Sequence, residues 1–125
     1  MNENEIAREI VDVAYKIHIS LGPDLLESVY ESVMTHEFSK RGLTFKRQQP
    51  IPIVYENLYL EEGFRADFLV ENKVIIELKS VEAIAPVHKK QLLTFLRLSN
   101  KHLGLLINFN VELIKNGITR IVNNL

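Results

Sequence analysis

Residues 65–80 read RADFLVENKVIIELKS, and this stretch decides the fold. Its two apolar segments, RADFLV and VIIELKS, each have the composition of a β-strand interrupted by charge. Glu77 and Lys79 are two residues apart, so the alternation of a strand places both side chains on one face. Buried charges are costly unless they are paired, hydrogen-bonded or bound to a metal. We therefore expect Asp67, Glu77 and Lys79 to have a function.

The spacing of the two segments predicts how their acids meet. If they form an antiparallel hairpin with a three-residue loop at 71–73, the numbers of facing residues sum to 144 and Asp67 lies opposite Glu77. A two-residue loop would instead place the two carboxylates on different faces. Carboxylates this close repel each other and raise a pKa unless a cation lies between them. Mg²⁺ or Mn²⁺ fits best, and the Leu78 carbonyl offers a further oxygen ligand.

Lys79 adds a positive charge beside these acids. It could stabilise a developing anion or help to activate a water molecule. A Lewis acid, an activated water and a cation near the phosphate are the parts that metal-assisted phosphodiester hydrolysis requires. The residues alone leave an alternative open, in which Glu77 and Lys79 are an ordinary pair on a solvated strand face. Asp67 would then bind Arg65 or a backbone amide.

Two glutamates fall on the apolar arc of a helix expected over residues 24–41. Asp24 is the expected N-cap, and Glu27, three residues later, has the spacing of a capping box. Glu27 could also point inward and reach the strands, although completing the cap is the simpler interpretation. Glu37 lies about 15 Å further along the helix, so the two acids cannot serve one metal. We expect Glu37 to be a buried, paired structural acid.

The rest of the chain predicts a mixed β-sheet with helices packed on it, an α/β (α+β) architecture. Gly22-Pro23 ends the first helix. Pro50 and Pro52 suit an edge strand or a bulge, and Asn57-Leu58 reads as a turn. Asn116-Gly117 predicts a hairpin turn before the last strand. The other expected elements are helices over 3–20 and 87–98 and strands over 43–56, 64–70, 74–80, 103–109 and 118–122.

Composition excludes several classes of protein. The 125 residues predict a single domain over residues 1–125, and a net charge of −1 gives no overall basic field for nucleic acid. The absence of cysteine excludes disulfides and thiol chemistry. The polar, acidic residues 1–5 do not read as a secretory signal, and no apolar run is long enough to span a membrane. We expect a cytoplasmic protein.

The order of these motifs resembles a known family. Asp67 followed by Glu77-Leu78-Lys79 is similar to the Asp…Glu-x-Lys signature of the PD-(D/E)XK nuclease superfamily. The segment LGPDLLESVY, residues 21–30, resembles the motif of its GxxExxY branch, as do QLLTFLRL and LGLLINF further along. Glu27 and Tyr30 match that motif, but Asp24 replaces its first glycine. Because Asp tolerates left-handed backbone, we expect the site to survive this replacement.

The resemblance implies a restriction-endonuclease-like core, a central mixed β-sheet flanked by α-helices. It implies a Mg²⁺ (or Mn²⁺) site from Asp67, Glu77 and Glu27, with Lys79 assisting the attacking water and Gln91 close by. Nuclease activity is what membership of the superfamily implies for this branch. Gln91 in isolation would be read as a surface residue. His88 we expect to be a satisfied core histidine rather than a ligand.

Partners are suggested by four basic clusters, which are either phosphate contacts or solvated surface. We expect nucleic acid, with DNA favoured over RNA, and a homodimer in which Gln49–Tyr55 could form the shared edge. Two alternatives to a nuclease stay open: a non-catalytic nucleic-acid-binding or assembly protein that keeps the fold, and a metal-dependent enzyme acting on a small phosphorylated substrate. The clusters are Lys40-Arg41, Lys46-Arg47, His88-Lys89-Lys90 and Lys101-His102.

Overall fold

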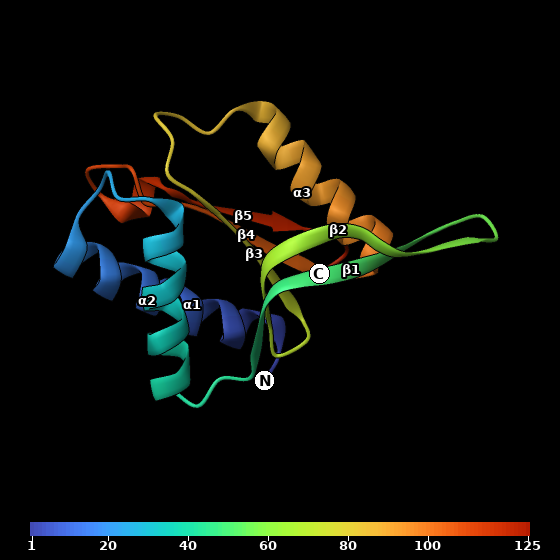
Figure 1. Ribbon diagram of the computed structural model, residues 1–125, viewed down its shortest axis with the longest axis horizontal. Coiled ribbons are helices and arrows are strands. Elements are labelled where there is room, and N and C mark those ends of the chain that lie inside the picture. Colours follow the sequence, from blue (N-terminus) through green and yellow to red (C-terminus); the bar gives the residue numbers. More distant parts are fainter.

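Five strands form one mixed sheet in the order β1-β2-β3-β4-β5 (Figure 1). The structure, a computed structural model, describes all residues from 1 to 125. Three α-helices and one short 3₁₀-helix complete the chain. The elements are α1 (Glu3–Leu21), α2 (Glu27–Lys40), β1 (Phe45–Tyr55), β2 (Leu58–Val70), β3 (Val74–Lys79), α3 (Pro86–Ser99), β4 (Leu103–Asn108), η1 (Ile114–Asn116) and β5 (Ile118–Val122).

The register between β2 and β3 is the one that the sequence predicts. Phe68 faces Ile76 and Val70 faces Val74, so facing residues sum to 144. The next pair in this register is Asp67 and Glu77. β3 then pairs parallel to β4 through the crossover helix α3, whereas β1–β2 and β4–β5 are antiparallel. The expected mixed sheet is thereby confirmed.

The helices cover the two faces of the sheet unequally, which gives three layers (Figure 1). α1 and α2 pack on one face, where α1 contributes the apolar stripe that includes Ile6, Ile10 and Ile17. α3 packs on the other face, where its Leu92 and Leu96 contact a smaller cluster. This arrangement is consistent with a restriction-endonuclease-like fold. No helix in the chain is both long and apolar enough to cross a membrane.

The start of α2 differs from the prediction. Asp24 does not cap the helix: it lies three residues earlier with a φ of 71°, in left-handed backbone. α2 begins at Glu27, and its N-cap residue, Leu26, provides no side-chain hydrogen bond. The physical reason is Tyr30, whose hydroxyl donates to the Gly22 carbonyl at 2.6 Å and holds residues 22–25 in a turn. The predicted left-handed tolerance of Asp24 is confirmed.

Two strand boundaries also differ. β2 begins at Leu58, which was predicted to lie in a turn, so β1 and β2 form a longer hairpin than expected. Asn116-Gly117 does not form a two-residue hairpin turn, because residues 109–117, including η1, connect β4 to β5. Gly117 is needed for a close approach: a Cβ there would lie 2.0 Å from the Asn108 carbonyl oxygen. The edge strand with its irregularity near the prolines is confirmed.

Candidate functional site

Both strands of the β1–β2 hairpin change face at one position. Ala66 packs in the cluster beneath α3, but Phe68, two residues later, packs in the cluster beneath α1 and α2. Regular alternation would place both on the same face. Opposite this step, Gln48 of β1 has left-handed backbone with a φ of 46°. The irregularity turns Asp67 toward the N-terminal half of α2, and such irregularities recur beside active sites.

Hydrogen bonds hold the Asp67 carboxylate in place. Its Oδ2 accepts the backbone N–H of Leu78 at 2.7 Å, which ties β2 to β3 just beyond their last backbone pair. Its Oδ1 accepts the Gln48 Nε2 amide at 3.1 Å. The same Nε2 donates to Glu31 at 2.6 Å, and Arg47 binds the other oxygen of Glu31. Gln48 therefore links two carboxylates from different elements.

The Glu77 carboxyl lies beside Asp67 in a buried setting. Alternation along β3 places Glu77 and Lys79 on the face of Ile75, which packs beneath α3. Glu77 Oε1 is buried and has no hydrogen-bond partner. Burial, and after it the charge of Asp67, raises the pKa of Glu77 to about 8, while the Lys79 ammonium opposes that rise. Asp67 and Glu77 therefore lie next to each other with the Lys79 ammonium group nearby, as the sequence predicts.

This pair of carboxylates fits a hard divalent cation. A buried carboxylate oxygen with no partner is costly, and a cation bound between Glu77 and Asp67 would remove both that cost and their mutual repulsion. The chain contains no group of three or more His, Cys, Asp or Glu side chains placed to hold one ion. Glu27 is therefore not grouped with the two strand acids, and further ligands would be backbone oxygens or water.

Glu27 lines a surface hollow of about 330 Å³ together with Asp67. Its side chain is exposed, because Glu27 is the first residue of α2 and the buried positions of this helix begin only at Tyr30. The hollow is lined by Glu27, Ser28, Glu31, Ser32, Arg47, Gln48, Asp67 and Leu78.

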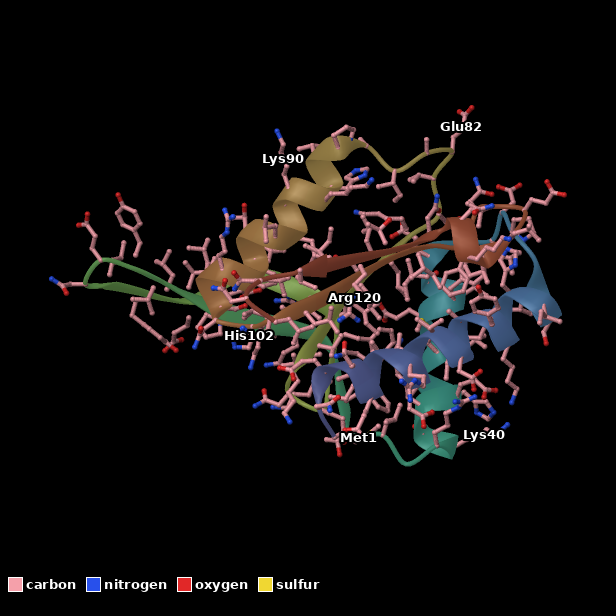
Figure 2. The ribbon with its side chains drawn as sticks, turned by 180° about the vertical axis from the view of Figure 1, so that it is seen from behind. Met1, Lys40, Glu82, Lys90, His102 and Arg120 are labelled. Carbon is pink, nitrogen blue, oxygen red and sulfur yellow. The ribbon has the colours of Figure 1, made fainter.

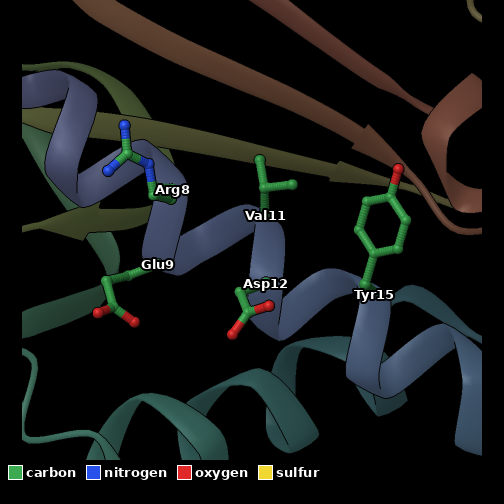
Figure 3. A pocket seen from close by; sticks show the side chains of 5 residues that line it. All are labelled: Arg8, Glu9, Val11, Asp12 and Tyr15. Atoms are coloured by element: carbon green, nitrogen blue, oxygen red, sulfur yellow. The ribbon is translucent and has the colours of Figure 1, made fainter.

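A larger hollow, about 630 Å³, lies along α1 and is separate from these acids (Figure 3). Its Glu9 and Asp12 point toward α2, where both bind Arg41, at 2.7 and 2.9 Å. These acids have a structural partner, so this hollow is not the candidate site.

The segment before α2 is anchored to the end of β3. Tyr30 is fully buried, its ring stacks on Phe109 at 4.2 Å, and its hydroxyl also accepts the Leu25 N–H. Ser80, which follows Lys79, donates its hydroxyl to the Leu25 carbonyl at 2.7 Å. These bonds fix the position of Glu27 relative to the strand that carries Glu77.

Asn108 is a buried polar residue that the sequence interpretation missed. It faces Lys79 in the parallel β3–β4 pair and is 2% exposed. Its side-chain amide bonds both the N–H and the carbonyl of Val81, at 3.1 and 3.0 Å. Asn108 thus fixes the chain where it leaves β3. The signal in the sequence is that Asn108 is the one polar side chain in the apolar run of residues 103–109.

Gln91, His88 and Glu37, the other predicted residues, form no hydrogen bond or ion pair with the two strand acids or Lys79. Gln91 is exposed on α3 and makes no hydrogen bond to Asp67, Glu77 or Lys79. His88 accepts the Ala85 N–H through Nδ1 at 3.1 Å, so it closes the start of α3 as a satisfied residue. Glu37 is the buried, paired acid that was predicted.

The ion pairs of Glu37 are structural. It binds Lys16 at 3.0 Å and Lys40 at 3.7 Å, and the hydrogen bond from Lys16 lowers the pKa of Glu37.

Most of the basic clusters have structural partners. Lys40 and Arg41 bind the acids of α1 and α2, Arg47 binds Glu31, and Lys101 and His102 bind backbone carbonyls. Three lysines of these clusters form neither an ion pair nor a side-chain hydrogen bond. They are Lys46, Lys89 and Lys90, and Lys90 projects outward from α3 (Figure 2).

A sequence model of the PD-(D/E)XK nuclease superfamily matches residues 4–121, nearly the whole chain. The chain belongs to the PD-(D/E)XK nuclease superfamily. Asp67, Glu77 and Lys79, whose order in the sequence resembles the superfamily signature, lie close together in the structure. Searches of curated proteins and of solved structures found no match. The superfamily supports a nuclease type of function with a nucleic-acid substrate, and its members generally use divalent metals.

Proposed function

We propose that this superfamily member is an active nuclease that requires Mg²⁺ or Mn²⁺ and hydrolyses phosphodiester bonds of nucleic acid, DNA rather than RNA. One observation carries the proposal: the buried, unpartnered oxygen of Glu77 lies beside the fixed carboxylate of Asp67, with Lys79 on the same strand. A protein that only binds nucleic acid has no need of a buried acid that is destabilised without a cation.

Each residue then has a task in hydrolysis. Asp67 and Glu77, with the Leu78 carbonyl, would hold the cation, which when bound supplies Lewis-acid activation of the phosphodiester. Lys79 would orient the attacking water and stabilise the charge that develops on the phosphate. The attacking water gives up a proton to solvent as its oxygen bonds to phosphorus, the ester P–O bond breaks, and the leaving oxygen takes up a proton.

Glu27 and Gln91 belong to the outer part of the proposed site. Glu27 lines the same hollow as Asp67, so it would act there through a bridging water rather than as a direct third ligand. Gln91 is exposed on the helix that covers the Glu77 face, where it would contact the substrate rather than the cation.

The surroundings favour a polymer as substrate. Ser28, Ser32 and Gln48 line the hollow and are exposed, so the hollow opens at the surface and does not enclose a small molecule. Lys89 and Lys90, which form no ion pair, would contact backbone phosphates. Two copies of the chain would place one site against each strand of a duplex, so we include a homodimer in the proposal.

Two finer assignments rest on the sequence. The left-handed backbone of Asp24 is what the motif glycine would provide, which supports membership of the GxxExxY branch. A cytoplasmic location stays a prediction from the sequence.

Cleavage of supercoiled plasmid and of a single-stranded oligonucleotide, with and without Mn²⁺, tests the proposal. We expect Lys79→Ala to abolish cleavage while leaving folding and Mn²⁺ affinity unchanged, and Asp67→Ala to lose both cleavage and metal affinity. Lys115→Ala, which changes an exposed lysine away from the site, is the matched control. Cleavage by Lys79→Ala at the wild-type rate, or equal Mn²⁺ affinity in Asp67→Ala, would overturn these assignments.

A further inference from the structure

The hairpin arm, residues 52–63 at the end of β1 and the start of β2, extends beyond the three layers (Figures 1 and 2). Its root is held firmly, because the Phe64 ring stacks on Phe95 of α3 with the centroids 3.9 Å apart. Beyond that root every residue from 54 to 63 is exposed, so nothing in the chain covers the arm.

The shape of the arm is specified by its sequence. Ile51 faces Phe64 and Ile53 faces Leu60, so one residue of β1 lies opposite three residues of β2. Gly63 lies in this bulge, and a Cβ there would be 2.2 Å from Ile53 Cδ1. Only glycine lets the Ile53 side chain lie across the strand. The arm is therefore a defined feature rather than an irregular loop.

The arm exposes apolar side chains on both faces. Tyr55 faces Leu58 and Val54 faces Tyr59, and alternation directs these two pairs to opposite sides of the hairpin. Tyr55, Tyr59 and Leu58 are between 57% and 64% exposed. A two-stranded hairpin alone is marginally stable in water, and an apolar surface of this kind marks an interaction site.

The chemistry of the arm indicates what covers it. The arm carries Glu56, Glu61 and Glu62, and the one nearby cation, Arg65, is already bound to Glu62. These carboxylates repel phosphates, so nucleic acid is not the partner. Pro50 and Pro52 lack N–H donors, which blocks pairing of another strand along this part of the edge. A protein that packs against the side chains is the remaining class.

We propose that the arm packs against the arm of a second copy of this chain about a two-fold axis. A two-fold interface must be complementary to itself, and the uncharged strip of Ile53, Tyr55, Leu58 and Leu60 meets that requirement. The four side chains of this strip offer roughly 400 Å² per copy, so two arms bury at most roughly 800 Å², which is in the range of weak interfaces. The interface is thus modest in area, and the dimer dissociates on dilution.

This surface specifies the homodimer included in the proposed function, but it needs neither cation nor cleavage. Its test is therefore made on the full chain without metal or nucleic acid, by sedimentation equilibrium between 1 and 100 μM protein (concentrations on the order expected for a small interface). Failure here would leave the proposed nuclease activity untouched, and failure of cleavage would leave the arm interface untouched.

We expect the wild-type chain to be a dimer at the upper concentration and the variant Tyr55→Ser/Leu58→Ser to be a monomer throughout. Both changed residues are exposed, so the variant should keep the wild-type circular dichroism spectrum and melting temperature of the isolated chain. Ile19→Ser, at an apolar residue of α1 that is 82% exposed, is the control and should remain a dimer. A wild-type monomer at the upper concentration, or a dimer that the arm variant does not weaken, would overturn the proposal.

Discussion

Leu78 donates its backbone N–H to the Asp67 carboxylate at 2.7 Å, just beyond Phe68–Ile76, the last backbone pair between β2 and β3. The Asp67 side chain thus continues the hydrogen bonding between β2 and β3 where their backbone pairing ends. The bond explains how Asp67 stays next to Glu77 although β2 changes face there. It also leaves the Glu77 oxygen without a donor of its own. The consequences of this arrangement can be measured without knowing the substrate.

Replacing Glu77 by Gln should change how stability depends on pH. The folded-state pKa of Glu77 is about 8, above the ordinary 4.5, so the folded protein holds this proton where the unfolded chain has lost it. The free energy of unfolding of the metal-free wild type should therefore fall as pH rises from about 4.5 to about 8, by up to a few kcal/mol. Glu77→Gln should lack this fall and be the more stable protein at pH 8.

Urea unfolding in buffer with a chelator, measured across this pH range, checks the prediction. Glu82→Gln changes an exposed glutamate on the loop after β3 and should follow the wild-type curve (Figure 2). Parallel curves for wild type and Glu77→Gln would contradict a buried, protonated Glu77.

Binding of a divalent cation should release a proton from Glu77. At pH 7 the metal-free carboxyl is mostly protonated, and a cation binds only its ionised form. Titration calorimetry with Mn²⁺ in buffers of different ionisation enthalpy should therefore report a release approaching one proton at pH 7. The release should decline as the pH rises past the pKa of about 8. Glu77→Gln should abolish it, and an unchanged release in that variant would assign the proton to another group.

The local register could be predicted from sequence, whereas the long-range contacts could not. A three-residue loop fixes which residues of two adjacent strands face each other, so the position of Asp67 relative to Glu77 followed from counting. Glu31 and Gln48 were missed because they are 17 residues apart and meet only after β1 changes face. Nothing in a strand pattern indicates that Gln48 will adopt left-handed backbone.

The errors at α2 and β2 have similar causes. Asp24 is of a residue type that often caps helices. The Tyr30 hydroxyl, six residues later, instead binds the Gly22 carbonyl and holds this segment in another conformation. The first residues of β2, Leu58-Tyr59-Leu60, are apolar but exposed, so no alternation of apolar and polar residues marks them as a strand. Glu27 is exposed because it lies before the buried part of α2, and helical phase alone does not show where that part begins.

Gln48 should contribute to metal affinity through Asp67, because its Nε2 holds Oδ1 of that carboxylate. Removing a group that orients a ligand typically costs about tenfold or more in metal affinity. Gln48→Ala and Gln48→Gly should both bind Mn²⁺ about tenfold more weakly than wild type.

The two variants should differ in stability. With a φ of 46°, glycine relieves backbone strain that alanine keeps, so Gln48→Gly should be more stable than Gln48→Ala by roughly 1 kcal/mol. Calorimetry and thermal unfolding measure the two quantities separately. Wild-type Mn²⁺ affinity in both variants would show that Gln48 does not position Asp67.

Tyr30→Phe should release the segment before α2 while keeping the packing of the ring. The variant loses the hydroxyl that donates to Gly22 at 2.6 Å and accepts from Leu25 at 3.3 Å, but the stack on Phe109 needs only the ring. Leaving these two backbone groups unpaired should lower the free energy of unfolding by about 1–3 kcal/mol. Hydrogen exchange at the Leu25 amide should become faster. The freed segment carries Glu27, so cleavage should fall more than Mn²⁺ affinity. Tyr15→Phe, at a half-exposed tyrosine of α1, is the matched control, and equal exchange at Leu25 in both variants would show that the Tyr30 hydroxyl does not hold this turn.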